Sequence, residues 1–229
     1  MKRTLFIILV IFMMANGLDG QELTNGLMEN YKLKKTIEGT YSRYNLKPSE
    51  IQGTPYLNEK FVPGKLITSK GAAYTGVPLR YNGYSDDLEF QKGEDSYNMD
   101  PKTIVKRAEF GGLVLVCVQY YEGRKSKDGF FQLLTEGKAT LLVKYTVKLL
   151  DKESAKPFIE PKPARFDDPK KDYYLSINGA PAVLISNKKS LLELFGAEKD
   201  KMESYISGNK LSIKKDDDMI KIVSRYNRL

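Results

Sequence analysis

Apolar and polar residues alternate with a period of two along positions 138–150. The odd positions from 141 to 149 are all apolar, whereas the even positions include Lys144, Thr146 and Lys148. Antiparallel sheets allow such a strand to keep one face on the core and the other face in water. We therefore predict a strand whose Lys144 face is exposed to solvent.

Three dipeptides that accept positive φ angles separate apolar runs, as in tight β-hairpins. They are Gly111-Gly112 between 103–110 and 113–121, Glu136-Gly137 between 130–135 and 138–150, and Asn178-Gly179 between 173–177 and 182–185. A two-residue loop in the first hairpin sets Ala108 opposite Leu115. The same register sets Lys106 opposite Cys117.

Residues 113–118 (LVLVCV) are apolar at every position and show no alternation. A run of this kind is typical of a strand that is buried on both faces. We therefore predict a central strand that a second sheet layer or a helix covers on each side.

The ends of the chain lack this β pattern. Residues 21–50 are polar, and a weak helical stripe predicts a partly helical segment. Residues 151–171 hold four of the ten prolines and many charges of both signs. Because proline cannot donate to a ladder, we predict an extended connection there and not a strand. From Asn187, a candidate N-cap, apolar residues recur at helical spacing and predict three helices.

These elements predict an α+β fold: an antiparallel β-meander, barrel- or sandwich-like, followed by a C-terminal helical segment. The predicted division is a signal peptide at 1–20, an N-terminal polar, partly helical segment at 21–50, an antiparallel β domain at 51–150, a Pro-rich charged connection at 151–171, and a hairpin plus C-terminal helices packing on the β domain at 172–229.

Residues 1–20 have the layout of a secretory signal peptide. A short positive start precedes ten consecutive apolar residues at 5–14, and small residues follow. Ten helical residues span about 15 Å, half of a bilayer core, which argues against a membrane-spanning helix. Small residues at 15 and 17 predict cleavage before Leu18, with cleavage before Gln21 as the alternative. We predict export to the periplasm or cell surface, with no transmembrane helix after cleavage.

Composition narrows the chemistry that is open to the chain. The 229 residues include one cysteine, no histidine and no tryptophan. This excludes Ser-His-Asp and Cys-His catalysis, His-ligated metals, an internal disulfide and a Cys-rich zinc site. The chain has no P-loop and no GxGxxG motif, so it indicates no nucleotide and no cofactor.

The chain is basic, and its C-terminal lysines are a candidate binding patch. It has 37 Lys and Arg against 29 Asp and Glu, and the loss of residues 1–20 changes the net charge from +8 to +7. Export argues against nucleic acid as the partner. The candidate patch for an anionic lipid or glycan comprises Lys188, Lys189, Lys210, Lys214 and Lys215. Acidic residues interspersed with these lysines leave an ordinary solvated face as the alternative.

Two further groups have candidate chemistry. Cys117 could act as a thiolate that Lys106 activates across the hairpin, but its place in an apolar run favours a small buried hydrophobe. Acidic residues cluster at 86–89, 167–168 and 216–218. Two carboxylates that face each other can act as a general acid and a general base. Each cluster also has a local explanation: the first lies in a turn, the second in the Pro-rich connection, and the third at a helix N-terminus, where negative charge is favourable.

Five stretches form a set: GTPYLNEKFVPGKL (53–66), GVPLRYNGYSDDLEF (76–90), GFFQLLTEGKATLLVKY (129–145), KKSLLELF (188–195) and SRYNRL (224–229). Together they resemble an uncharacterised family of exported proteins from gram-negative bacteria with no assigned function. The resemblance covers most of the chain from about residue 51. It implies export and a shared fold, and it implies no site residue.

Three functional hypotheses follow. The leading one is an exported, non-enzymatic envelope protein with a protein-binding or structural role, which an uncovered apolar patch or an unpaired sheet edge would favour. The alternative is a module that binds an anionic lipid or glycan through the C-terminal lysines, which must then meet on one face. The second alternative is a carboxylate-dependent glycan hydrolase, which needs two acidic side chains facing across a cleft. We expect no catalytic residue, metal or cofactor under the leading hypothesis.

Overall fold

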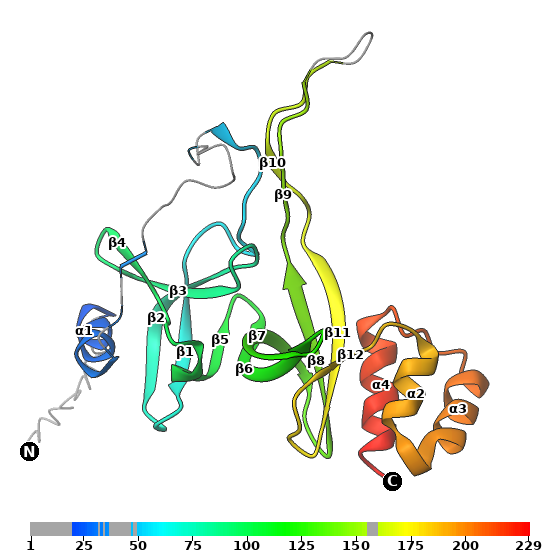
Figure 1. Cartoon of the computed structure of the whole chain (residues 1–229). Coiled ribbons are helices and arrows are strands. Elements are labelled where there is room, and N and C mark those ends of the chain that lie inside the picture. Colours follow the sequence, from blue (N-terminus) through cyan, green and yellow to red (C-terminus); the bar gives the residue numbers. More distant parts are fainter. Residues whose placement is uncertain (1–19, 32, 34, 37–46, 48–49, 155–159) are drawn as a thin grey trace, which may run out of the picture.

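A computed structural model describes residues 20–31, 33, 35–36, 47, 50–154 and 160–229. Its main element is a ten-stranded antiparallel sheet, curved as a half-barrel, with helices at its C-terminal side (Figure 1). The sheet order is β12-β11-β8-β7-β6-β5-β1-β2-β3-β4. The predicted α+β class, a meander followed by C-terminal helices, is therefore confirmed.

The strands of the main sheet are β1 (Val62–Thr68), β2 (Ala73–Asn82), β3 (Asp87–Lys92), β4 (Asp95–Asn98), β5 (Val105–Phe110), β6 (Leu113–Glu122), β7 (Lys125–Thr135), β8 (Ala139–Thr146), β11 (Lys170–Ile177) and β12 (Val183–Leu184). The helices are α1 (Gly20–Tyr31), α2 (Lys188–Leu194), α3 (Lys199–Gly208) and α4 (Asp216–Tyr226), with short 3-10 turns at Lys102–Ile104 and Gly196–Glu198.

One end of the sheet curls back onto its middle. The Ala182 N–H donates to the Gln119 carbonyl (2.8 Å), and the Tyr121 N–H donates to the Ala182 carbonyl (3.2 Å). The end of the β11–β12 hairpin thus meets β6, so β6, β7, β8, β11 and β12 form a ring of strands. Val116, Tyr120 and Phe131 pack inside this ring.

The predicted central strand is confirmed as β6, which lies between β5 and β7. Leu115 and Cys117 face the core beneath β1–β5, whereas Val116 and Val118 face the ring interior. Both faces are covered because the sheet curves around the strand on each side. This explains the absence of alternation in residues 113–118.

The three predicted hairpins are present. Gly111 and Gly112 both have positive φ (54° and 78°), and Ala108 pairs with Leu115 as predicted. In the β7–β8 hairpin the loop comprises residues 136–138 and is longer than the predicted two residues, and the pairing is irregular between Leu133 and Thr135. The third hairpin turns at Asn178-Gly179, again with positive φ at both positions.

The predicted exposure of the Lys144 face is wrong. The Lys144 side chain lies inside the ring and the residue is only 8% exposed, while its neighbour Leu142 on the same face is fully buried. The alternation correctly separates two faces of β8. One face packs against the helices, and ring closure encloses the other, so neither face is in water.

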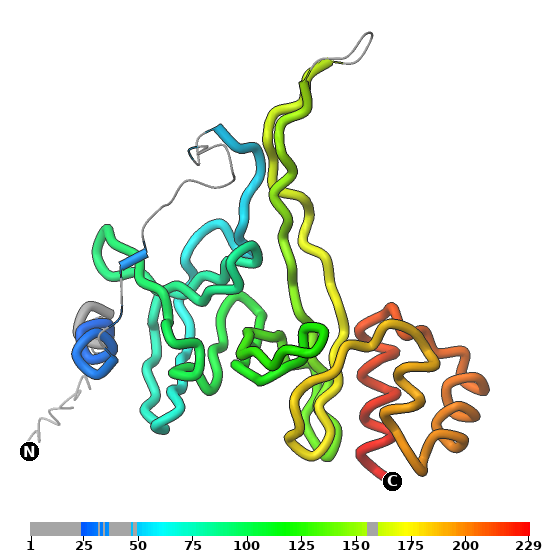
Figure 2. Tube along the Cα trace, viewed as in Figure 1, coloured from blue at the N-terminus to red at the C-terminus, as the bar shows by residue number. Residues whose placement is uncertain are grey.

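Residues 148–154 and 160–167 form a projecting two-stranded arm rather than the predicted strand-free connection (Figures 1 and 2). Its base pairs β9 (Leu149–Leu150) with β10 (Arg165–Phe166). Farther out, Glu153 and Lys162 exchange two backbone hydrogen bonds of 2.9 and 3.1 Å. The prolines do not prevent this pairing, because Pro161 and Pro163 lie on either side of Lys162. The N–H that the pairing requires is that of Lys162, which is present.

The C-terminal helices form as predicted. Asn187 caps α2, since its side chain accepts the Ser190 N–H (2.9 Å) and its own N–H donates to the Ser190 hydroxyl (3.1 Å). Their apolar stripes pack on the outer face of β8 and β11 through Leu191, Leu192, Phe195, Met202, Ile206, Met219, Ile222, Val223 and Tyr226.

The N-terminal lead-in packs on the other end of the sheet. Helix α1 lies against β2 and β3 and buries Leu27 completely. Lys35 then bridges Tyr97 on the edge strand β4. The predicted signal peptide lies outside the described residues except for Gly20, which begins α1. Within the described part of the chain, no helix has the length and apolarity needed to cross a bilayer.

Candidate functional sites

A partly buried charged cluster, centred on the buried Lys144, lies at the ring near the β2–β3 turn. The Lys144 Nζ lies 2.9 Å from Asp86 Oδ1. It also lies 4.7 Å from the ring centroid of Phe131 and 5.1 Å from that of Tyr120. These contacts hold the ammonium group between an opposite charge and two aromatic faces.

Asp86 joins the β2–β3 turn to the ring. Its backbone is in the left-handed region (φ 58°), which aspartate tolerates better than most residues. Its carboxylate accepts the Tyr81 hydroxyl (2.8 Å) and the Phe130 N–H (3.2 Å). Lys102 completes the cluster with a 2.9 Å contact to Asp87. Two lysines therefore balance two aspartates.

Electrostatics favour a structural role for this cluster. Burial lowers the pKa of Lys144, and the adjacent Asp86 charge opposes that shift. Burial, followed by the nearby Asp86 charge, raises the pKa of Tyr81 well above its usual range. Gly129 lets the groups approach, because a Cβ there would lie 2.8 Å from a Tyr120 ring carbon. Lys144 is packed against aromatic rings and paired with Asp86. The cluster therefore holds the β2–β3 turn against β7 and β8.

Cys117 does not have the environment of a nucleophile. It lines a hollow with Lys106 and Asp128, so the predicted neighbour is present. Burial, helped by the negative charges of Asp128 and Asp86, nevertheless raises the pKa of Cys117 to about 12. The side chain is therefore a neutral thiol at physiological pH, and the alternative of a small, largely apolar residue fits it best.

We expect iodoacetamide to alkylate Cys117 in the folded protein about a hundredfold more slowly near pH 8 than in the unfolded chain, since the thiolate fraction falls with the raised pKa. Mass spectrometry of timed samples, with and without guanidinium chloride, measures both rates. Equal rates in the two samples would contradict the assignment of a neutral, shielded thiol.

The acidic cluster at 216–218 begins α4, as predicted, and Asp216 has specific partners. It accepts the Tyr173 hydroxyl (2.5 Å) and lies 2.9 Å from Lys171 Nζ. Burial alone would raise the pKa of Asp216, but the hydrogen bonds from Tyr173 and Lys171 outweigh it and lower this pKa. Asp216 therefore fastens α4 to β11 and is no raised-pKa acid.

Asp216→Asn should lower the free energy of unfolding by about 1 kcal/mol at neutral pH, since the site is partly open to water. A depressed aspartate pKa stabilises the fold above the unfolded value, and this contribution fades as pH falls through the folded value. The difference between the two proteins should thus be constant above pH 5 and shrink below 3.8, the ordinary pKa of aspartate. Urea unfolding across that range checks it; a difference independent of pH would contradict the assignment.

The five lysines predicted as a patch, hereafter the lysine patch, lie at one end of the helical unit. The Lys188 Nζ at the start of α2 lies 3.0 Å from the Ser207 hydroxyl in the last turn of α3. Lys210 follows that turn, and Lys214 and Lys215 precede α4. Glu203 shares this end, 3.7 Å from Lys188, so the patch is only partly free of acidic neighbours.

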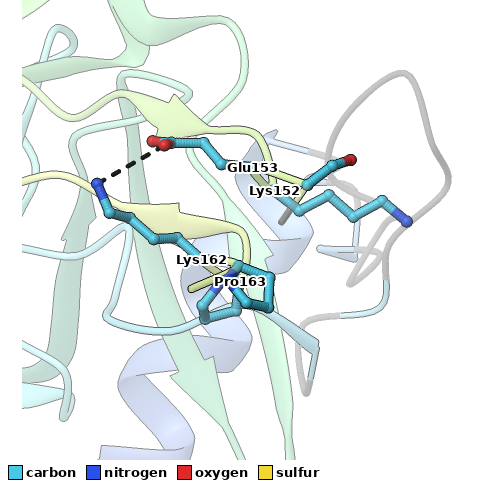
Figure 3. A pocket seen from close by; sticks show the side chains of 6 residues that line it. Lys152, Glu153, Lys162 and Pro163 are labelled. Atoms are coloured by element: carbon cyan, nitrogen blue, oxygen red, sulfur yellow. Dashed lines mark ion pairs between the residues drawn. The ribbon is translucent and has the colours of Figure 1, made fainter. Parts of the chain in front are cut away.

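The distal arm is the other candidate site. Its described residues, 151–154 and 160–163, are all exposed. A shallow hollow there is lined by Lys152, Glu153, Ser154, Pro161, Lys162 and Pro163. Figure 3 shows Glu153 and Lys162 reaching toward each other across the arm (3.6 Å), while Lys152 points away from that pair. The base is anchored by Gln52, which bonds to Ala164 and Phe166.

An exposed apolar patch lies where β12 meets β6. Tyr121 is 47% exposed, and Val183 and Leu184 are 37% and 41% exposed. The parallel bridge between Tyr120 and Ala182 places Tyr121 and Val183 side by side on the outer face, because both buried partners point inward. The sequence did not reveal this patch, since it depends on contact between distant segments.

Within the described ranges, no group of three or more His, Cys, Asp or Glu side chains is arranged to hold a metal ion. Comparison with known proteins was negative: no family model, no curated protein and no solved structure matches the chain.

Proposed function

We propose that this chain is an exported, non-enzymatic envelope protein that binds another protein through the β9–β10 arm. The arm itself is the observation that supports this role. Ordering each backbone residue costs about 1–2 kcal/mol in conformational entropy. The exposed distal arm has few contacts with the body to offset that cost, whereas a bound partner would supply them.

Other features agree with a protein-binding role. The exposed side chains of Tyr121 and Val183, side by side on the outer face of the ring, offer an uncovered apolar surface for an interaction. Among the described residues, Cys117 and Lys144 are two groups with nucleophilic potential, and they are respectively a neutral thiol and a paired, packed ammonium. Both environments favour a structural role for the side chain over nucleophilic catalysis.

An arm-shortened variant tests this proposal. It joins Asp151 to Ala164 by an Asn-Gly turn, because the pairing of Leu150 with Arg165 sets these residues opposite each other and the bond from Gln52 to Ala164 is kept. We expect the full chain to migrate in a native complex from the bacterial envelope, and the shortened chain to migrate alone with an unchanged melting temperature. A shortened chain that stays in the complex would contradict the proposal.

The lysine patch supports a second candidate, the binding of an anionic lipid or glycan. Helix order sets these lysines near one end of the helical unit, which supports this function; the function further requires that they meet on one face. Flotation with phosphatidylglycerol vesicles tests it. We expect binding that weakens with salt, that falls when Lys189, Lys214 and Lys215 become glutamine, and that the arm-shortened variant retains. Absence of binding at low salt would eliminate this candidate.

A further inference from the structure

The two edges of the distal arm differ in their ability to accept another strand. On the β10 side, Pro161 and Pro163 have no backbone N–H, and Gln52 already covers the base through its bonds to Ala164 and Phe166. Proline is a common means of blocking an edge against pairing. The β10 edge is therefore closed to an added strand.

The β9 edge, by which we mean the outer edge of residues 149–154 that extend β9 into the distal arm, retains its donors. Glu153 directs both its N–H and its C=O to Lys162, so strand alternation turns the backbone N–H of the next residue, Ser154, to the opposite side. Neither Lys152 nor Ser154 is proline, and both are exposed. Lys152 and Ser154 thus present a short open edge next to the hollow lined by the two prolines.

We propose that the β9 edge binds an extended segment of a partner protein by β-strand addition, with an apolar side chain of that segment in the hollow beside Pro161 and Pro163. This inference rests on the proposed protein-binding function and names the chemistry of the partner. Main-chain hydrogen bonds supply affinity in this mode, and a pocket for alternate side chains supplies selectivity.

A second copy of the chain is a poorer occupant. Symmetric antiparallel pairing sets a residue opposite its own copy. Centring that pairing on Asp151, Lys152 or Glu153 would bring like charges face to face, which destabilises a strand pair. A separate protein with an uncharged, apolar extended segment avoids this conflict.

The test uses a displayed library of random twelve-residue peptides, selected on the purified chain from residue 21. The best peptide is titrated against the parent chain, Ser154→Pro and Ser154→Ala. Only the proline variant removes the outward N–H, and the alanine variant is its matched control. We expect Ser154→Pro to weaken binding at least tenfold and Ser154→Ala less than twofold, with equal melting temperatures.

Amide hydrogen exchange should also show protection at Ser154 when the peptide is bound. Equal affinity of the proline variant, equal loss in both variants, failure to select any peptide, or self-association through the arm would each overturn strand addition. The proposed function fails separately, because it depends on the arm-shortened variant leaving its native complex. A complex that is lost on shortening but is insensitive to Ser154→Pro would refute strand addition alone.

Discussion

Asp86→Asn is expected to lower the free energy of unfolding by about 3 kcal/mol, because it leaves the Lys144 ammonium without its counter-charge in the ring interior. Asparagine tolerates the left-handed backbone of residue 86 and can still accept the Tyr81 hydroxyl, so the substitution removes mainly the charge. Urea unfolding at neutral pH measures the loss. Since Lys144 in the folded variant binds its proton less tightly than an unfolded lysine, the loss should shrink as pH rises toward 10.5, the ordinary pKa of lysine.

Asp172→Asn is the matched control for Asp86→Asn. Its partner Lys170 lies at 2.9 Å, but the lysine side chain is 65% exposed. An exposed pair of this kind contributes about 0–1 kcal/mol, so the control should change stability little. Similar losses for the two variants would show that the Asp86–Lys144 pair has no special role in the ring.

Gly64→Ala is expected to destabilise the fold by about 3 kcal/mol, at the upper end for overpacking a core. A Cβ at this position would lie 2.5 Å from the Glu109 carbonyl oxygen and 2.7 Å from the Phe110 Cβ. Gly64 lies on β1 at the irregularity in its pairing with β2, where β5 approaches closely. Backbone atoms cannot rotate away, so β1 and β5 must separate.

Gly208→Ala serves as the control for Gly64→Ala. A Cβ there would meet no atom within 4 Å, and the residue ends α3. Alanine is the better helix former by about 1 kcal/mol, so this variant should be neutral or slightly stabilised in the same unfolding experiment. A Gly64→Ala protein as stable as the parent would contradict the close β1–β5 approach.

The sequence predicted the turns and the helix cap, which are determined by residues close together in the chain. The glycine-containing turns fixed the hairpins at Gly111-Gly112 and Asn178-Gly179, and Asn187 marked the start of α2. The burial of both faces of residues 113–118 was also apparent from composition alone. For the turns and the helix cap, the deciding interactions lie within a few residues along the chain.

The missed features depend on distant contacts. Lys144 appeared exposed because nothing near it in sequence indicates that Ala182 closes the ring against Tyr120. Gly129 was the available signal, since a glycine inside a strand often marks a close approach. The arm was not predicted because the proline content of this segment argues against strand pairing. Lys162 lies between two prolines, and nothing near it in the sequence indicates that it pairs with Glu153. Of the candidate site, the sequence predicted the lysine patch but neither the arm nor the Asp86–Lys144 pair.

Site-specific photo-crosslinking in the producing cell tests the protein-binding role of the arm most directly. A benzophenone amino acid replaces Lys152 on the arm, or Glu94 in the exposed turn between β3 and β4 as the control. We expect a discrete adduct with a second protein from position 152 and none from position 94. No adduct from position 152, or the same adducts from both positions, would contradict it.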